Sequence, residues 1–258
     1  MKKKYFIVGI IIIVYIVIMI LIFGSKSKDN KNQYMFIGNQ TKWRLVNNEW
    51  LDISNLNQII NDNKFYVYDE SGYIGNYELN YVNNKWYIFD DNQNPINLNG
   101  ELFAVNKKIE VKNYEISAIT ESDIEKINKY NKKSYLTIKD LDNLTTNQKI
   151  VVDLDSDNND EILYFISNMF TSNQQDNGKY FSYVLYLKNN RLYELKNTKK
   201  TQNNRFDSYN YSISKIIDYN SDGKYEIIIN KIPFRPYGEC KIMYGFKNNK
   251  YQIIKDCD

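Results

Sequence analysis

The C-terminal half of the chain contains two acidic stretches of one pattern, Asp153-Leu-Asp-Ser-Asp-Asn-Asn-Asp-Glu161 and Asp218-Tyr-Asn-Ser-Asp-Gly-Lys-Tyr-Glu226. Each places a carboxylate or an amide at positions 1, 3 and 5 and a carboxylate at position 9. This alternation gathers oxygen atoms around one point, as a hard cation requires. We name the stretches loop 1 (residues 153–161) and loop 2 (residues 218–226), and we expect calcium in both.

The predicted ligands are the side chains at positions 1, 3, 5 and 9 and the backbone carbonyl at position 7. Because Asp, Asn and Gly are also ordinary turn residues, a solvated turn is the alternative interpretation of either loop alone. The recurrence of one spacing in one context favours the metal sites. The predicted ligands are Asp153, Asp155, Asp157, Asn159 and Glu161 in loop 1, and Asp218, Asn220, Asp222, Lys224 and Glu226 in loop 2.

The flanks of the loops exclude an EF-hand. That motif needs an acidic side chain at position 12 and a helix on each side, whereas position 12 is Tyr164 in loop 1 and Ile229 in loop 2. Short apolar runs rich in branched residues follow both loops, Ile162–Ile166 and Ile227–Ile229. Such runs are typical of buried strands.

A strand, an Asp-x-Asp/Asn-x-Asp-Gly-x-x-Glu loop and a second strand together resemble the calcium loop of FG-GAP/VCBS-type repeats, the family found in integrin-like β-propellers. Loop 2 matches this motif more closely, since loop 1 has Asn158 where the family prefers glycine. Asparagine tolerates the left-handed conformation better than most residues do. The resemblance implies propeller-like blades, complete or incomplete, and calcium as the cofactor.

The N-terminus predicts a membrane anchor. Residues 5–23 form an apolar run without charge, long enough as a helix to cross most of a hydrocarbon core of about 30 Å. The lysines at positions 2–4 place residues 1–4 in the cytoplasm and the remainder outside it. A cleaved signal peptide is the alternative, but its apolar core is normally shorter. We expect an uncleaved signal-anchor, a single-pass protein of the cell membrane and a short tether over residues 24–33.

The charge distribution argues against a nucleic-acid partner. The net charge of +3 comes entirely from the three lysines that precede the apolar run, because the 31 Asp and Glu all lie beyond it and are balanced there by 31 Lys and Arg. The outer part of the chain is therefore neutral, whereas a phosphate-binding surface needs an excess of basic residues.

One hairpin pattern occurs four times. Its copies are centred on Asn-Asn pairs, which can form two-residue turns with positive φ. This turn sets an apolar cross-strand pair in each copy, and such pairs stabilise a hairpin. A ligand-binding role for Trp50 or Trp86 is the minority interpretation, and Phe103–Val111 is a candidate fifth copy. The predicted pairs are Leu45–Trp50, Tyr81–Trp86, Leu187–Leu192 and Phe246–Tyr251.

The last hairpin also predicts a disulfide. Continuing its register outward places Cys240 opposite Cys257 at a non-hydrogen-bonded position, where Cα atoms lie about 4.5 Å apart. A disulfide can close at such a position and persists outside the cytoplasm. Two reduced, packed thiols are the alternative.

The predicted fold class is mainly β, a repeat of antiparallel hairpins with one transmembrane helix and one or two short helices. The short helices are Ser54–Asn61 and Ser122–Tyr130, each with a capping residue and an apolar face. Beyond the tether, the expected regions are an N-terminal hairpin region (34–112), a bridging segment (113–150) and the calcium-loop repeat region (151–258).

The composition disfavours an enzyme. The chain has no His, which excludes Ser-His, Cys-His and His-ligated zinc chemistry, and it has no glycine-rich phosphate loop. A carboxylate-based hydrolase using Asp69, Glu70, Asp90 or Asp91 is a weak alternative. We expect a non-catalytic module of a bacterial cell envelope that binds a polymer or a protein; a structural component of an envelope complex is the second hypothesis.

Overall fold

The computed structural model describes most of the chain beyond the predicted anchor. The predicted transmembrane segment 5–23, nearly all of the tether and the predicted helix Ser54–Asn61 lie outside the described residues. No helix within the described part has the length and apolar character needed to cross a membrane. The described residues are 33–38, 41–53, 64–83, 85–90, 92, 94–98, 100–130, 144–169, 179–201, 208–234 and 238–257.

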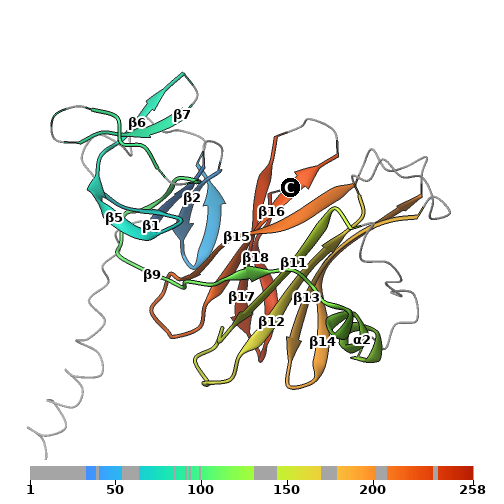
Figure 1. The fold of residues 1–258 in the computed structure, drawn as a ribbon. Helices are drawn as coiled ribbons and strands as arrows, with labels where there is room; N and C mark the ends of the chain where they lie inside the picture. Colours follow the sequence, from blue (N-terminus) through green and yellow to red (C-terminus); the bar gives the residue numbers. More distant parts are fainter. Residues whose placement is uncertain are drawn as a thin grey trace, which may run out of the picture. The chain divides into compact units, whose positions relative to one another are not determined.

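Three antiparallel sheets and a separate hairpin make up the described fold (Figure 1). The outer sheet has the order β10-β11-β12-β13-β14. Loop 1 joins β11 to β12, and an Asn-Asn turn joins β13 to β14. The strands are β10 (Ile116–Ser117), β11 (Thr146–Val152), β12 (Glu161–Ser167), β13 (Lys179–Lys188) and β14 (Arg191–Thr201).

The middle sheet repeats this plan, with the order β18-β17-β16-β15-β9. Loop 2 joins β15 to β16, and another Asn-Asn turn joins β17 to β18. Its fifth strand comes from the N-terminal half of the chain. The strands are β9 (Glu110–Val111), β15 (Tyr209–Asp218), β16 (Glu226–Pro233), β17 (Cys240–Lys247) and β18 (Lys250–Lys255).

The N-terminal sheet has six strands in the order β3-β2-β1-β8-β4-β5, and the hairpin β6-β7 forms a small sheet of its own. The strands are β1 (Gln33–Ile37), β2 (Thr41–Val46), β3 (Glu49–Asp52), β4 (Phe65–Asp69), β5 (Gly72–Tyr77), β6 (Leu79–Val82), β7 (Lys85–Ile88) and β8 (Phe103–Val105).

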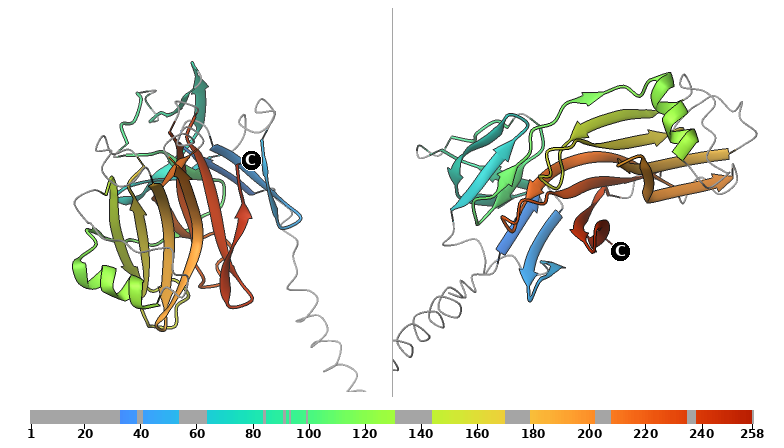
Figure 2. Two further views of the ribbon diagram at one scale, coloured as in Figure 1. Left: turned by 90° about the vertical axis from the view of Figure 1, so that its right-hand side faces the viewer. Right: turned by 90° about the horizontal axis from the view of Figure 1, so that it is seen from below.

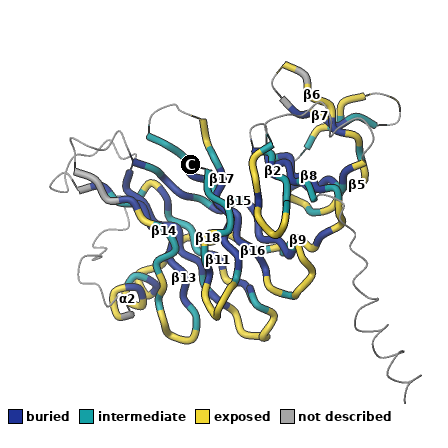
Figure 3. The backbone as a smooth tube through the Cα atoms, turned by 180° about the vertical axis from the view of Figure 1, so that it is seen from behind, coloured by how far each residue is buried: buried dark blue, intermediate teal, exposed yellow. Residues whose placement is uncertain are grey.

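The middle sheet is buried on both faces. In β16, Ile227 and Ile229 pack with the outer sheet, while Ile228 packs with the N-terminal sheet. Successive residues of a strand point to opposite faces, so an unbroken isoleucine run fits a sheet covered on both sides. Buried residues line the strands and exposed ones mark the turns (Figure 3).

The outer faces of the stack are covered by other elements. The helix α2 (Glu121–Tyr130) packs Ile127 against the outer sheet, beside which it lies in Figure 2. The β6-β7 hairpin packs Leu79 and Trp86 against the N-terminal sheet. The structure shows no closed propeller among the described residues. The expectation of a propeller is therefore confirmed only as far as antiparallel sheets, because a helix and a hairpin cover the faces where further blades would pack.

The predicted helix Ser122–Tyr130 is confirmed and begins one residue earlier. Thr120 caps it, because its hydroxyl oxygen accepts from the backbone N–H of Asp123 at 3.4 Å, while its own backbone N–H donates to the Asp123 carboxylate at 3.0 Å. Asp123 is fully buried and forms an ion pair with Lys149 of β11 at 3.0 Å. The helix is thereby held to the outer sheet by charge as well as by its apolar face.

All four Asn-Asn hairpins have the predicted register. The pairs Leu45–Trp50, Tyr81–Trp86, Leu187–Leu192 and Phe246–Tyr251 lie opposite one another. Each described turn asparagine has positive φ, as a type I′ turn requires. The two tryptophans are buried in apolar clusters, which fits their predicted structural role.

The prediction of a fifth hairpin copy at Phe103–Val111 is wrong. Its two strands do not pair with each other: β8 lies between β1 and β4, whereas β9 joins the middle sheet beside β15. The segment therefore links two sheets. Its centre has Lys107-Lys108 in place of Asn-Asn, and neither lysine has positive φ.

The disulfide between Cys240 and Cys257 is present, although its local register differs from the prediction. An irregularity between Met243 and Tyr244 shifts the pairing, so that Met243 lies opposite Lys255. Cys257 therefore lies beyond the end of β18, and the two Cα atoms are 6.0 Å apart. This separation still lies within the range that a disulfide spans.

Removing the disulfide is expected to lower the free energy of unfolding by roughly 3 kcal/mol, because the bond closes a loop with a sequence separation of 17 residues. Denaturant unfolding of wild type and of the variant with Cys240→Ser and Cys257→Ser measures the difference. Reductant should weaken the wild type and leave the variant unchanged. Equal stabilities of the oxidised wild type and the variant would contradict the prediction.

Candidate metal centre

Loop 1 is organised by backbone N–H groups that point at its carboxylates. Asp153, at position 1, accepts hydrogen bonds from the backbone N–H groups of Asp157 (3.2 Å) and Asn158 (3.1 Å). Glu161, at position 9, accepts one from Leu154 (2.8 Å). These bonds close the loop on itself and hold its first and last carboxylates near the start of β12.

Loop 2 has the same bonds at the same positions. Asp218 accepts hydrogen bonds from the backbone N–H groups of Asp222 (3.2 Å) and Gly223 (2.9 Å). Glu226 accepts one from Tyr219 (3.3 Å). The two loops are thus structural copies as well as copies in sequence.

The central carboxylates are held alike in both loops. Asp157 accepts from the backbone N–H of Asn159, and Asp222 accepts from that of Lys224, each at 2.8 Å. The position 7 residues therefore orient the position 5 carboxylates through their N–H groups. Their role as carbonyl ligands stays a prediction.

The chain turns through left-handed residues at equivalent places. Ser156 and Asn158 have φ of 58° and 64°, and Ser221 and Gly223 have φ of 62° and 77°. Asn158 therefore adopts the conformation that glycine has in loop 2, as the sequence predicted. Asparagine reaches this region at a small cost.

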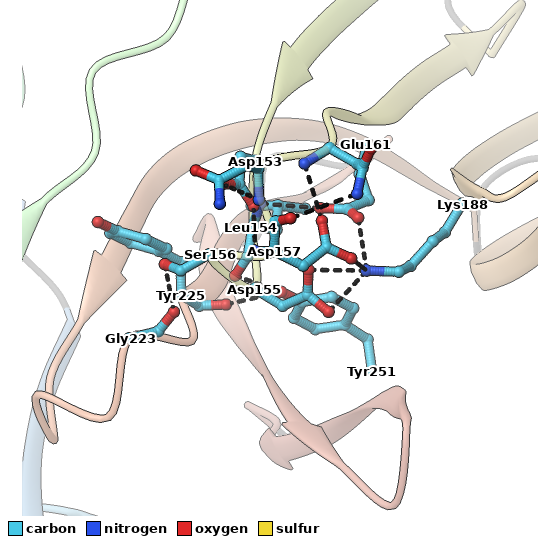
Figure 4. A network of polar contacts seen from close by, with 12 residues as sticks. Asp153, Leu154, Asp155, Ser156, Asp157, Glu161, Lys188, Gly223, Tyr225 and Tyr251 are labelled. Carbon is cyan, nitrogen blue, oxygen red and sulfur yellow. Dashed lines mark hydrogen bonds and ion pairs between the residues drawn. The ribbon is translucent and has the colours of Figure 1, made fainter.

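The two loops lie side by side. The Ser156 hydroxyl of loop 1 donates to the Gly223 carbonyl of loop 2 at 2.7 Å, and the Tyr225 N–H donates to the Leu154 carbonyl at 2.8 Å. The buried Tyr251 hydroxyl lies 2.9 Å from the Tyr225 carbonyl oxygen and 3.3 Å from that of Leu154. Loops far apart in the chain thus form one continuous structure (Figure 4).

The carboxylates of loop 1 converge on a lysine. Asp153, Asp155 and Glu161 each present an oxygen, and the three oxygens lie within 4.8 Å of one another. Figure 4 shows Lys188, from the end of β13, reaching into the cluster. Its ammonium lies 2.6 Å from Asp155, 2.9 Å from Asp157 and 2.7 Å from Glu161. A cation carried by the chain therefore offsets part of the negative charge of loop 1.

Titration behaviour follows from this geometry. Burial alone would lower the pKa of Lys188, but hydrogen bonds to Asp155, Glu161 and Asp157 outweigh it and raise that pKa. Burial raises the pKa of Glu161, although its hydrogen bond to Lys188 opposes the change. The lysine stays charged, and it offsets part of the cost of burying the glutamate.

Loop 2 has acids without a matching cation. Glu226 is 3% exposed, and burial raises its pKa to about 8, with the charges of Asp222 and Asp218 adding to the effect. No lysine or arginine of the described residues forms an ion pair with these three acids. The nearby Lys224 ammonium instead lies over the Phe246 ring, 5.1 Å from its centre.

No family model, curated protein or solved structure matches this chain. The resemblance of the two loops to FG-GAP/VCBS-type repeats thus stays a prediction.

The structure brings together only part of the predicted ligand set. Within the described residues, loop 1 supplies the one group of three acids whose oxygens converge. In loop 2, the Asn220 amide donates to the Asp222 carboxylate at 3.0 Å, so these two predicted ligands contact each other. The Lys188 ammonium pairs with three of the loop 1 acids, whereas the charges of Asp222 and Asp218 disfavour ionisation of Glu226 in loop 2.

Lys188 is the functional residue that sequence reasoning missed. It precedes the Asn189-Asn190 turn, and Lys247 occupies the same place before Asn248-Asn249. Lys188 reaches loop 1, whereas Lys247 is exposed and forms no ion pair among the described residues. A lysine directly before an Asn-Asn turn could have been noticed in the sequence. The same pattern occurs at Lys247, however, and that lysine does not pair with an acidic loop.

Two of the carboxylates considered for hydrolysis, Asp69 and Asp90, hold turns. Asp69 accepts from the N–H and the hydroxyl of Ser71, and Asp90 accepts from the N–H groups of Asn92 and Asn94. These bonds are typical of Asx turns. Asp91 lies outside the described residues.

Proposed function

We propose that the chain is a single-pass membrane protein whose outer part is a non-catalytic, calcium-stabilised binding module of a bacterial cell envelope. Support for the location comes from the apolar run at residues 5–23, the preceding lysines and the disulfide between Cys240 and Cys257. Disulfides persist in oxidising compartments and are rare in the cytosol. The ligand is an envelope polymer or a protein.

Loop 2 is the principal calcium site in this proposal. The observation that carries it is the burial of Glu226 beside two aspartates with no ammonium in ion-pair contact among the described residues. Buried charges are normally paired or coordinate metals. Asp218, Asn220, Asp222 and Glu226 would supply oxygen ligands, which match the preference of calcium.

Loop 1 is the second and weaker site. Calcium enters it only by displacing the Lys188 ammonium, which already contacts three carboxylates. Each of the two loop-bearing sheets is then a calcium repeat that resembles a propeller blade, with the ion pinning the strand after the loop. Support for this comes from the matching hydrogen bonds of the two loops.

Calcium should raise the midpoint of thermal unfolding of the full-length protein in detergent, and chelator should reverse the rise. A ligand that binds only the folded state at a hundred times its Kd adds about 2.7 kcal/mol of stability. Asp222→Ala should abolish most of the shift, while Asp157→Ala should abolish less of it. An unchanged unfolding curve of the wild type in calcium would exclude both sites.

Co-sedimentation separates a binding module from an assembly component. Purified protein mixed with insoluble cell-wall material should pellet with it if the domain binds an envelope polymer. Protein that stays in the supernatant would favour the structural role in an envelope complex.

A further inference from the structure

A cavity of about 670 Å³ lies away from the acidic loops. Its lining comes mainly from three parts of the fold: the turn between β4 and β5, the segment that follows β9, and the middle of β15. Glu101, Asn230 and Glu239 complete it. It therefore opens where the N-terminal sheet meets the middle sheet. Ligand sites commonly have volumes of about 300–1,000 Å³ and lie between packed units.

A bulge in β15 directs a lysine to this cavity. The pairing of β15 with β16 shifts between Ile213 and Lys215, which leaves Ser214 as the extra residue. Ile213 and Ile216 consequently share the core facing the outer sheet, and Lys215 falls on the opposite face with Ile217. Bulges redirect side chains in this way and often occur beside binding sites.

The Lys215 ammonium is under-satisfied for a buried charge. The residue is 7% exposed and lines the cavity, and its ammonium donates to the Asp69 carbonyl oxygen at 3.1 Å. No carboxylate of the described residues lies within ion-pair distance of it. An ammonium has three donors, so two of them remain available to a ligand.

The neighbouring polar groups are largely occupied with one another. Lys241, behind the cavity wall, pairs with Glu101 at 2.7 Å and with Glu239 at 2.9 Å. The second Glu101 oxygen accepts from the Ser214 hydroxyl, and the Tyr114 hydroxyl donates to the Ser214 carbonyl. These bonds hold the wall in place without using the two spare donors.

Glycine lets two carboxylates lie close to the backbone at the rim. A Cβ atom at Gly38 would lie 2.6 Å from Glu101 Oε1, and one at Gly100 would collide with the Glu70 carboxylate. Glu70 is exposed and lines the cavity, and its carboxylate makes no hydrogen bond or ion pair among the described residues. It is the acceptor most available to a bound ligand.

The mixed charges of the lining favour a neutral polar ligand. Four carboxylates and two lysines line the cavity, so an anion would meet an excess of negative charge, and a cation bound beside Lys215 would be repelled by its ammonium. A hydroxyl group accepts from an ammonium and donates to a carboxylate without adding charge. Tyr114 and the half-exposed Ile116 add an apolar wall, against which the C–H face of a sugar ring can pack. The lining groups are Asp69, Glu70, Glu101, Glu239, Lys112 and Lys215.

We propose that this cavity binds a neutral saccharide unit, with one hydroxyl accepting from Lys215 and another donating to Glu70. This assignment names the ligand class of the binding module and rests on the proposed function for the exposure of the domain outside the membrane. It does not depend on either calcium loop.

Binding of a panel of soluble neutral and acidic oligosaccharides, and of inorganic phosphate, to the full-length protein in detergent tests the proposal. We expect at least one neutral oligosaccharide to bind. Lys215→Met and Glu70→Gln should each weaken this binding about tenfold or more, as the loss of a charged hydrogen bond implies. Lys247→Met, which changes an exposed lysine at the end of β17 and outside the cavity, should bind like wild type.

Thermal unfolding of the variants shows whether a loss of binding comes from the missing contact or from a failure to fold. Lys215→Met removes an under-satisfied buried charge, so its midpoint of thermal unfolding should equal or exceed that of wild type.

Binding of acidic oligosaccharides or phosphate alone, binding unaffected by both variants, or no binding would each overturn the assignment. If wild type and Lys215→Met co-sediment equally with cell-wall material, the result supports the binding module and contradicts the saccharide site in the cavity. If calcium does not change the stability of the protein while the cavity variants lose saccharide binding, the result contradicts the calcium sites and supports the cavity.

Discussion

Replacing Lys188 by methionine is expected to destabilise the calcium-free protein by about 3 kcal/mol and to open loop 1 to calcium. Removing one partner of a buried ion pair costs roughly 3–5 kcal/mol because the other charge is left uncompensated. We expect the lower end, since the Lys188 side chain is 18% exposed and that of Asp157 is 39% exposed. Glu161, with a side-chain exposure of 1%, would be the charge left most isolated.

Unfolding of wild type and Lys188→Met in chelator and in saturating calcium measures this effect, and calorimetric titration counts the ions bound. The variant should recover most of its stability in calcium and bind a second ion more tightly than wild type does. Lys247→Met is the matched control, because this lysine precedes the equivalent turn and is exposed. A variant as stable as wild type in chelator would show that the lysine does not compensate the cluster.

The calcium-free protein is expected to lose stability as the pH rises from about 4.5 to about 8. Burial and the neighbouring aspartates raise the pKa of Glu226 in the folded state from 4.5 to about 8. The folded state therefore holds this proton more tightly than the unfolded state does, and the stability that the group provides is complete below pH 4.5. Between the two pKa values, stability falls by at most about 1.4 kcal/mol per pH unit.

Denaturant unfolding in chelator across this pH range, on wild type and Glu226→Gln, measures the slope. Glutamine cannot ionise, so the variant should lose this contribution and be more stable than wild type above pH 8. Calcium should stabilise wild type more as the pH rises, because it binds the ionised carboxylate, and should have little effect at loop 2 of the variant. Identical pH profiles of the two proteins would contradict the account of loop 2.

The hairpins could be predicted because their determinants are local. Two asparagines with positive φ set the register of each turn, and the apolar pair beside the turn stabilises it. The same reasoning failed at Phe103–Val111, where Lys107-Lys108 replaces the asparagines and the flanking strands pair with distant partners. It also missed the shift between Met243 and Tyr244, although the neighbouring Gly245 is a residue that often marks a bulge inside a strand.

In the acidic loops too, the local features could be predicted and the long-range contacts could not. Their internal hydrogen bonds join residues a few positions apart, so the spacing of Asp153–Glu161 and Asp218–Glu226 was enough to predict two copies of one structure. The difference between the copies arises from Lys188, which approaches from another strand of the sheet. Lys247 has the same local sequence and a different environment, so no local pattern could separate them.

The sequence by itself determined the short-range features: the β class, the four turns, the helix at residues 122–130 and the fold of each acidic loop. These depend on φ preferences, alternation and bonds between near neighbours, which the order of residues states directly. Only the tertiary structure decided where the charged side chains lie, namely Lys188 against the loop 1 carboxylates and Lys215 in the lining of the cavity that Glu70 also lines. These positions depend on how the three sheets pack. Packing decides which side chains surround a charged residue, whereas the local sequence decides only where that residue lies on its strand.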